Sequence, residues 1–244
     1  MGQLREGREL DVSSESRVLA LDAVDVPVLH VRPDGMPRAG LVLCPDVGGM
    51  RPLFDEMARR IATHNIAVCV VEPFAGVPAD ELSTIDARMA RVAQFDDHQQ
   101  LEMLSSAADL LVVEDGVSRV CALGFCMGGH YVFKAAASDR FDAAVSFYGM
   151  VRTPDGWNGP GHTIEPLAVA AQMCPTLAIF GGADHFTPAA DIDALRAAWA
   201  GRPDCEIVVI EGAEHGFVHD PDRPVHRAED AAACWDRAIN WVLG

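Results

Sequence analysis

Residues 119–129 read RVCALGFCMGG, an apolar run that ends in a glycine-rich turn with a cysteine at its centre. The run is typical of a strand buried on both faces, and the pattern from about Met127 to Ala137 favours a helix. Between a strand and a helix, G-x-C-x-G is a form of the nucleophile elbow, in which the reactive side chain stands on a strained turn. The glycines let strand and helix approach closely. We therefore expect Cys126 to be a nucleophile.

Apolar runs of the same kind recur on both sides of this stretch and alternate with helical patterns. The other runs that read as buried strands are 40–44, 67–71, 143–147, 176–180 and 206–210. Strands that alternate with helices imply βαβ units and a mostly parallel sheet with helices on both faces. Two earlier apolar segments, Val18–Leu21 and Val26–Val31, favour an N-terminal hairpin. Together with the elbow, this rhythm predicts the α/β class and the α/β-hydrolase fold.

The length of 244 residues suits one large α/β domain. Residues 1–16 are polar and charged, so we expect them to form a flexible arm ahead of a single α/β-hydrolase domain over 17–244. Two segments within that domain, 74–94 and 152–165, lack a regular pattern. The strand–helix rhythm resumes after both, so we expect insertions over the active end of the sheet.

The net charge and the cysteines narrow the class of function. A formal net charge of −17 argues against nucleic-acid and membrane partners, since polyanions and anionic membrane surfaces repel an acidic protein. No apolar stretch is long enough to span a membrane, and residues 1–16 lack the apolar core of a secretory signal. The seven cysteines are odd in number and include no CxxC pair, which is typical of reduced thiols in a cytoplasmic protein. No heptad pattern demands a partner, so we expect a monomer.

An acid and a histidine follow Cys126 in the order that α/β-hydrolases use. Asp184 lies just past the expected strand 176–180, and His215 lies just past the expected strand 206–210. Because ligand crevices form at the carboxyl ends of parallel strands, both side chains are expected beside the nucleophile. His215 would accept the thiol proton and later activate water, while Asp184 would hold the imidazole tautomer.

A cysteine in this position implies covalent catalysis through a thioester intermediate. The turn places Cys126 at a helix N-terminus, where a developing anion is stabilised and the pKa of a thiol is lowered. The backbone N–H of Met127, the residue after the nucleophile, would form half of an oxyanion hole.

At these residues the chain resembles the dienelactone hydrolase family, over most of its length from about Val18. Three segments carry the resemblance: Gly-Phe-Cys-Met-Gly-Gly at 124–129, Gly-Gly-x-Asp-His-Phe-x-Pro at 181–188 and Gly-x-x-His-x-Phe at 212–217. The resemblance implies hydrolysis of a small-molecule ester or lactone, without a cofactor. It also implies that Asp46, where the family usually has glutamate, holds the resting cysteine, and that Val47 offers the second oxyanion N–H.

The chain departs from the family where arginines bind the carboxylate of dienelactone. It has Ala-Gly-Val at 75–77 near one such position and His219 at the other. Arg51 is a candidate replacement cation, and aromatic residues near the expected site are candidates to line a pocket. The candidate substrate-binding residues are therefore Arg51, Tyr148, Phe186 and His219.

Three other functions stay open on the residues alone. A non-catalytic ligand-binding or regulatory protein could retain the fold, since fold does not imply function, and its Cys126 would be unreactive toward iodoacetamide. A thiol redox sensor would oxidise Cys126, with Cys121 as the nearest cysteine in the sequence. A zinc site would draw on His215, His219 and His226, although no cysteine pair accompanies them; we therefore expect no metal.

Overall fold

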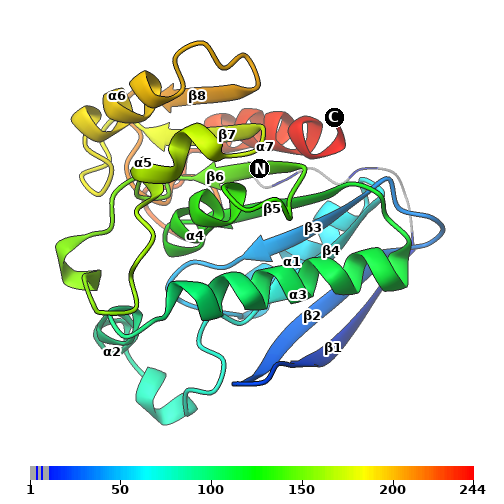
Figure 1. The fold of residues 1–244 in the computed structure, drawn as a ribbon. Helices are drawn as coiled ribbons and strands as arrows, with labels where there is room; N and C mark the ends of the chain where they lie inside the picture. The colour runs from blue at the N-terminus through cyan, green and yellow to red at the C-terminus, as the bar shows by residue number, and fades with distance from the viewer. Residues whose placement is uncertain (1–3, 5–6, 8–10) are drawn as a thin grey trace.

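One eight-stranded sheet runs through the computed structural model, which describes Leu4, Gly7 and residues 11–244 (Figure 1). The strand order is β1-β2-β4-β3-β5-β6-β7-β8. β2 pairs antiparallel with both β1 and β4, and all the other neighbouring strands, including β3, pair in parallel. The strands are β1 (Val12–Ala20), β2 (Asp25–Pro33), β3 (Ala39–Cys44), β4 (Ile66–Val71), β5 (Val120–Phe125), β6 (Ala143–Phe147), β7 (Thr176–Gly181) and β8 (Cys205–Ile210). The predicted strands and the N-terminal hairpin are confirmed.

Helices cover both faces of this sheet. The helices are α1 (Pro52–Ala62), α2 (Ile85–Val92), α3 (Asp97–Asp115), α4 (Met127–Ala136), α5 (Pro166–Val169), α6 (Ala189–Ala198) and α7 (Ala228–Leu243), with short 3-10 turns η1 (Ala79–Leu82), η2 (Asp155–Trp157) and η3 (Ala170–Gln172). α3 and α4 pack on one face, in front of the sheet in Figure 1, while α1 and α7 pack behind it. Every residue of β3 to β7 is buried, which is why these strands read as unbroken apolar runs.

The N-terminal boundary differs from the prediction. The arm was expected over 1–16, but β1 begins at Val12 and pairs with β2 from Val12 opposite Pro33 to Ala20 opposite Asp25. The polar composition of residues 12–16 predicts no strand because β1 is the edge strand of the sheet. Its residues alternate between half-buried and exposed positions, which tolerate serine and glutamate. The remainder of the predicted arm, apart from Leu4, Gly7 and Asp11, lies outside the described residues.

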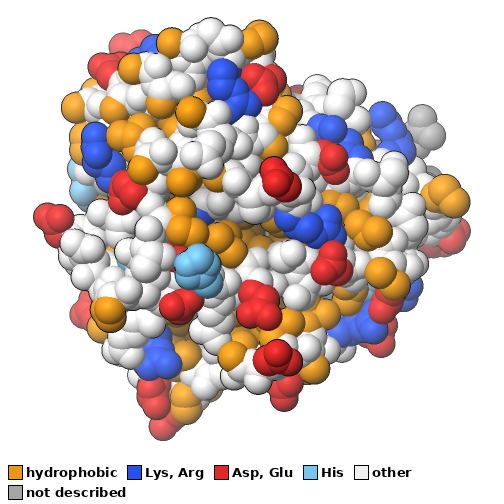
Figure 2. Space-filling model, viewed as in Figure 1, with side chains coloured by type: hydrophobic (Ala, Val, Ile, Leu, Met, Phe, Trp, Pro, Cys, Tyr) orange, Lys and Arg blue, Asp and Glu red, His pale blue; other side chains and the backbone are white. Residues whose placement is uncertain are grey.

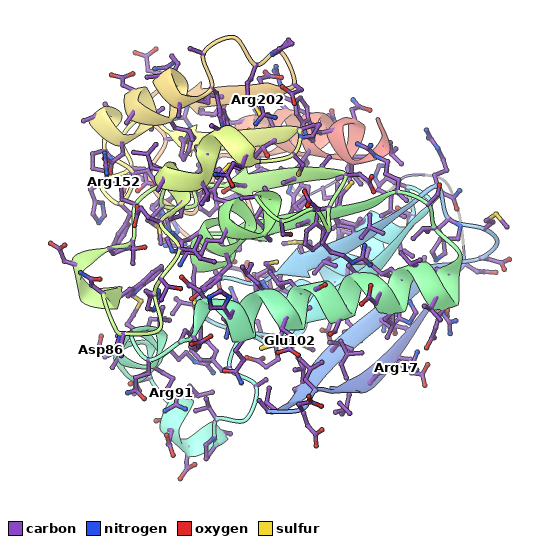
Figure 3. The ribbon with its side chains drawn as sticks, in the orientation of Figure 1. Arg17, Asp86, Arg91, Glu102, Arg152 and Arg202 are labelled. Carbon is purple, nitrogen blue, oxygen red and sulfur yellow. The ribbon has the colours of Figure 1, made fainter. Side chains whose placement is uncertain are left out.

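The two segments without a regular pattern both lie at the carboxyl end of the parallel strands. Segment 74–94 contains η1 and α2. The sequence pattern does not predict α2, because a helix of only eight residues gives little periodicity. Thr84 caps α2 by accepting a hydrogen bond from the Ala87 N–H at 3.1 Å. Figure 3 shows Asp86 and Arg91 of α2 and Arg152 of the second segment on the same side of the molecule.

Charged side chains of both signs are dispersed over the surface. On the face seen in Figure 2, acidic and basic side chains are interspersed, and hydrophobic side chains are visible within a hollow near the centre. Among the described residues, no helix combines the length and the apolarity that crossing a membrane requires.

Candidate active site

The turn at Cys126 has the strained geometry that the sequence predicts. Cys126 follows β5, precedes the first residue of α4, and adopts φ 54° and ψ −115°, a left-handed backbone that costs a non-glycine residue about 1–3 kcal/mol. The glycines around Cys126 are required because a larger side chain would clash with neighbouring backbone atoms. A Cβ on Gly128 would stand 2.2 Å from the Cys44 carbonyl oxygen, and one on Gly124 would stand 2.5 Å from the backbone of Gly128. The close approach of β3, β5 and α4 therefore holds the strain in place.

The structure brings the predicted acid and histidine together beside this turn. Asp184 lies in the loop after β7 and His215 in the loop after β8, and His215 Nδ1 is 2.7 Å from Asp184 Oδ2. The second oxygen of Asp184 accepts a hydrogen bond from the Phe186 N–H at 2.8 Å, which fixes the carboxylate plane. Cys126 and His215 line the same cavity. The three side chains come from separate loops at one edge of the sheet.

The surroundings of His215 favour its protonated form. Burial by itself disfavours the imidazolium, but the hydrogen bond to Asp184 and the interactions with Asp184 and Cys126 outweigh burial and raise the pKa of His215 to about 9. An imidazolium beside a cysteine is the arrangement that stabilises a thiolate nucleophile.

Asp46 sits at the same cavity but is held by groups other than the cysteine. Its Oδ1 accepts hydrogen bonds from Arg51 at 2.6 Å and from the Gly48 N–H at 2.8 Å, and its Oδ2 is 2.9 Å from Arg51 and 2.7 Å from His219 Nε2. Burial alone would raise the pKa of Asp46, but His219 and Arg51 hold it well below its usual range. Among the described residues, no hydrogen bond joins this carboxylate to Cys126.

Two of the candidate substrate-binding residues, His219 and Tyr148, are buried and hydrogen-bonded to each other. His219 is buried, lines the cavity, and its Nδ1 is hydrogen-bonded to the Tyr148 hydroxyl. Burial is the main reason that the pKa of His219 is lowered and that of Tyr148 raised. Tyr148 is fully buried and is absent from the cavity lining, so its part in substrate binding stays a prediction. It follows the carboxyl end of β6, where the sequence pattern does not distinguish a cavity face from the core.

The cavity itself has a volume of about 570 Å³. Its lining consists of Asp46, Val47, Gly48, Arg51, Ile85, Met89, Cys126, Met150, Pro154, Trp157, Phe186, His215, His219 and Arg223. The two segments predicted to cover the active end both contribute, through α2 and through η2 with its preceding proline. Phe186 is 47% exposed, and its ring lies 4.8 Å from the His215 ring, so it stands at the mouth beside the histidine.

Two arginines line this cavity, and only one is neutralised. Arg51, the predicted replacement cation, is bound through both terminal nitrogens to Asp46. Arg223 is exposed, and among the described residues no acidic side chain pairs with it. Sequence analysis does not predict a role for Arg223, because this residue lies in an irregular loop where no periodicity or motif shows that its side chain faces the cavity.

The candidate oxyanion donors lie at the same end of the sheet. Val47 follows β3 and lines the cavity, and Met127 is the first residue of α4. The first N–H groups of a helix have no intrahelical partner, so the Met127 N–H is free to receive a negative oxygen.

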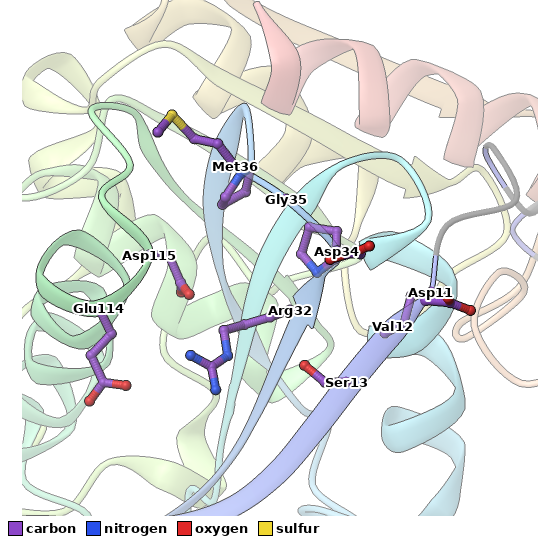
Figure 4. A pocket seen from close by; sticks show the side chains of 11 residues that line it. Asp11, Val12, Ser13, Arg32, Asp34, Gly35, Met36, Glu114 and Asp115 are labelled. Carbon is purple, nitrogen blue, oxygen red and sulfur yellow. The ribbon is translucent and has the colours of Figure 1, made fainter.

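Other candidate sites receive no support from the geometry. No three His, Cys, Asp or Glu side chains among the described residues are grouped so that they could hold a metal ion. A second cavity of about 750 Å³ lies at the amino end of the parallel strands, where Arg32, Asp34 and Glu114 line it (Figure 4). It contains none of the predicted catalytic residues.

Comparison with known proteins places the chain among enzymes. The model of the dienelactone hydrolase family matches residues 26–243. A Yersinia pestis protein assigned as a carboxymethylenebutenolidase is 29% identical over 89% of this chain and 83% of its own length, and the Rhodococcus opacus carboxymethylenebutenolidase is 27% identical over 88% and 85%. A Klebsiella pneumoniae structure assigned to the dienelactone hydrolases is 25% identical and superposes with a TM-score of 0.84 over 95% of this chain and 98% of that one. The α/β-hydrolase fold is thereby confirmed.

Proposed function

Because this chain belongs to the dienelactone hydrolase family and is an ester or lactone hydrolase, we propose that it acts through Cys126 as a nucleophile. The observation that carries the proposal is the convergence of Cys126, His215 and Asp184 at one edge of the sheet. Three residues distant in the sequence share this edge in the order that acyl transfer by this fold requires.

The first half-reaction forms a thioester. His215 Nε2 takes the thiol proton of Cys126, and the sulfur attacks the carbonyl carbon of the ester or lactone. The carbonyl oxygen becomes an oxyanion, which the N–H groups of Met127 and Val47 would stabilise. The carbon–oxygen bond to the leaving group then breaks, and His215 returns the proton to the departing alkoxide or enolate.

The second half-reaction releases the acid. His215 takes a proton from water, the hydroxide attacks the thioester carbon, and the carbon–sulfur bond breaks as His215 returns the proton to the sulfur of Cys126. Asp184 acts throughout on the histidine, because its 2.7 Å contact with Nδ1 directs Nε2 toward the reacting atoms.

The cavity supports a small substrate that carries a negative charge. Its lining is mostly apolar, and of the two arginines that line it, Arg223 has no acidic partner among the described residues. A substrate carboxylate near Arg223 would be recognised by charge, because Arg51 is already neutralised by Asp46. This placement differs from the positions at which the family pattern led us to look for arginines.

Hydrolysis of p-nitrophenyl acetate by the wild type and by Cys126→Ala tests the proposed nucleophile. We expect the variant to lose nearly all turnover while its circular dichroism spectrum is unchanged, because the thioester cannot form. Equal hydrolysis by both proteins would refute the role of Cys126. Absence of hydrolysis by both, with Cys126 inert to iodoacetamide, would favour the non-catalytic binding protein.

A further inference from the structure

The segment after β6 forms one wall of the cavity. We call residues 151–167 the wall loop. Its ends are tied together, because the Leu167 N–H donates to the Val151 carbonyl at 3.0 Å and the Thr153 N–H lies 3.1 Å from both oxygens of Glu165. Between these ties, Pro154 and Trp157 line the cavity. The position of the wall loop therefore affects the size of the cavity that Cys126 also lines.

A buried ion pair outside the cavity holds the return half of the wall loop. Lys134 Nζ lies 2.6 Å from Asp97 Oδ1, and both side chains are fully buried. The other carboxylate oxygen, Asp97 Oδ2, accepts hydrogen bonds from the N–H groups of Thr163 at 2.9 Å and Ile164 at 2.8 Å. The Asp97 N–H in turn donates to the Gly161 carbonyl at 2.9 Å. Lys134 thus orients Asp97, and Asp97 binds the backbone of the wall loop.

A histidine on the same helix holds the opposite end of the loop. His130 Nδ1 is 2.8 Å from the carbonyl oxygen of Met150, which directly precedes the wall loop, and its ring makes an edge contact with Trp157 at 5.7 Å. His130 and Lys134 follow Cys126 at intervals of four residues, so they lie along one side of α4. The helix that begins after Cys126 therefore also carries both residues that anchor the wall loop.

Stability alone does not account for the charges in this arrangement. Removing two charges from water carries a large desolvation cost, and apolar replacements of a buried ion pair are often as stable. What the Asp97 carboxylate provides and an apolar side chain cannot is a bond to two backbone N–H groups of the wall loop.

We propose that the Lys134–Asp97 pair is a positioning element of the substrate cavity. It holds the wall loop, and Trp157 with it, at a fixed distance from Cys126, and so limits the size of the acyl group. The proposal builds on the proposed ester hydrolysis, but it concerns the shape of the cavity rather than the identity of the nucleophile.

Ester selectivity of a double variant tests this role. Asp97→Ala combined with Lys134→Met removes both charges together, so no unpaired charge stays buried. We expect the ratio of kcat/KM for p-nitrophenyl octanoate to that for p-nitrophenyl acetate to rise about tenfold, mostly through KM, because methylene-sized changes in a pocket are worth about that much. Trp157→Ala should produce the same shift, and combining it with the double variant should add little.

Two further variants separate positioning from general loss of structure. Asp97→Asn with Lys134→Met keeps an oxygen that can accept from the Thr163 or Ile164 N–H, so it should restore part of the wild-type selectivity. Arg140→Gln is the matched control. Arg140 pairs with Asp109 of α3 at 2.8 Å, close to the same two helices, but this pair is exposed and does not contact the wall loop. Its selectivity should equal that of the wild type.

Hydrogen exchange gives a readout that needs no turnover. In the wild type the Thr163 and Ile164 amides should be protected by their bonds to Asp97, and in the alanine–methionine variant a peptide covering 158–165 should exchange about tenfold faster. A peptide from β2 should be unchanged. Unchanged exchange in 158–165, or faster exchange with unchanged selectivity, would overturn the proposal. If Cys126→Ala were as active as the wild type, only the proposed nucleophile would fail, because ester selectivity would still report the cavity.

Discussion

Replacement of Asp184 by asparagine isolates the contribution of the carboxylate to the protonation of His215. The pKa of His215 is raised from an ordinary 6.5 to about 9, which corresponds to roughly 3 kcal/mol in favour of the imidazolium at about 1.4 kcal/mol per pKa step. Burial lowers the pKa of His215, and Asp184 and Cys126 raise it. Without the Asp184 carboxylate, Cys126 is the main group left that favours the imidazolium. We therefore expect the pKa of His215 to fall toward or below its ordinary value in Asp184→Asn.

The assay is the alkylation of Cys126 by iodoacetamide between pH 5 and 9, followed by mass spectrometry. When less of His215 is protonated, the thiolate is stabilised less. The rate of alkylation at neutral pH should therefore fall by about tenfold to a hundredfold, and kcat/KM by roughly 10²–10⁴. Asp193→Asn is the control, because Asp193 pairs with Arg196 on the exposed side of α6. An alkylation profile identical to that of the wild type would refute the assigned link between Asp184 and His215.

The same raised pKa predicts a pH dependence of stability. A histidine whose pKa is higher in the folded than in the unfolded state stabilises the fold fully below pH 6.5, and this stabilisation disappears as the pH rises through about 9. The free energy of unfolding of the wild type, measured with urea, should lose up to about 3 kcal/mol from this residue over that interval. Asp184→Asn should show a much smaller loss, and an equal loss would contradict the explanation.

Three further changes test the site and its support. Asp46→Asn should lower the free energy of unfolding at pH 7 by about 3 kcal/mol in urea titrations, since it removes the charge that Arg51 and His219 face. This deficit should shrink as the pH falls below the ordinary pKa of 3.8, because the unfolded wild type then takes up a proton that the folded carboxylate does not. Gly128→Ala should cost more than about 3 kcal/mol because its Cβ meets backbone at 2.2 Å, while Gly156→Ala, with nothing within 4 Å, should melt like the wild type. Arg223→Gln should raise KM about tenfold for an ester with a carboxylate but leave KM for neutral p-nitrophenyl acetate nearly unchanged, and equal effects on both would exclude charge recognition.

The sheet, the elbow and the order of the proposed catalytic residues were predictable from the sequence because each leaves a local signal. Strands buried on both faces appear as apolar runs, and the glycines around Cys126 mark the turn that needs them. Parallel strands then place everything after their carboxyl ends at one edge. The proximity of Asp184 and His215 follows from that rule without any knowledge of distances.

The partners of the charged residues were decided by the tertiary structure alone. Asp46 meets His219 across 173 residues, and Lys134 meets Asp97 across 37, and neither contact leaves a pattern in the local sequence. The sequence also does not distinguish Arg51 from Arg223, although in the fold Arg51 pairs with Asp46 and Arg223 has no acidic partner among the described residues. Periodicity reports how deeply a residue is buried, whereas hydrogen bonds between distant loops depend on where the packed elements bring those loops together.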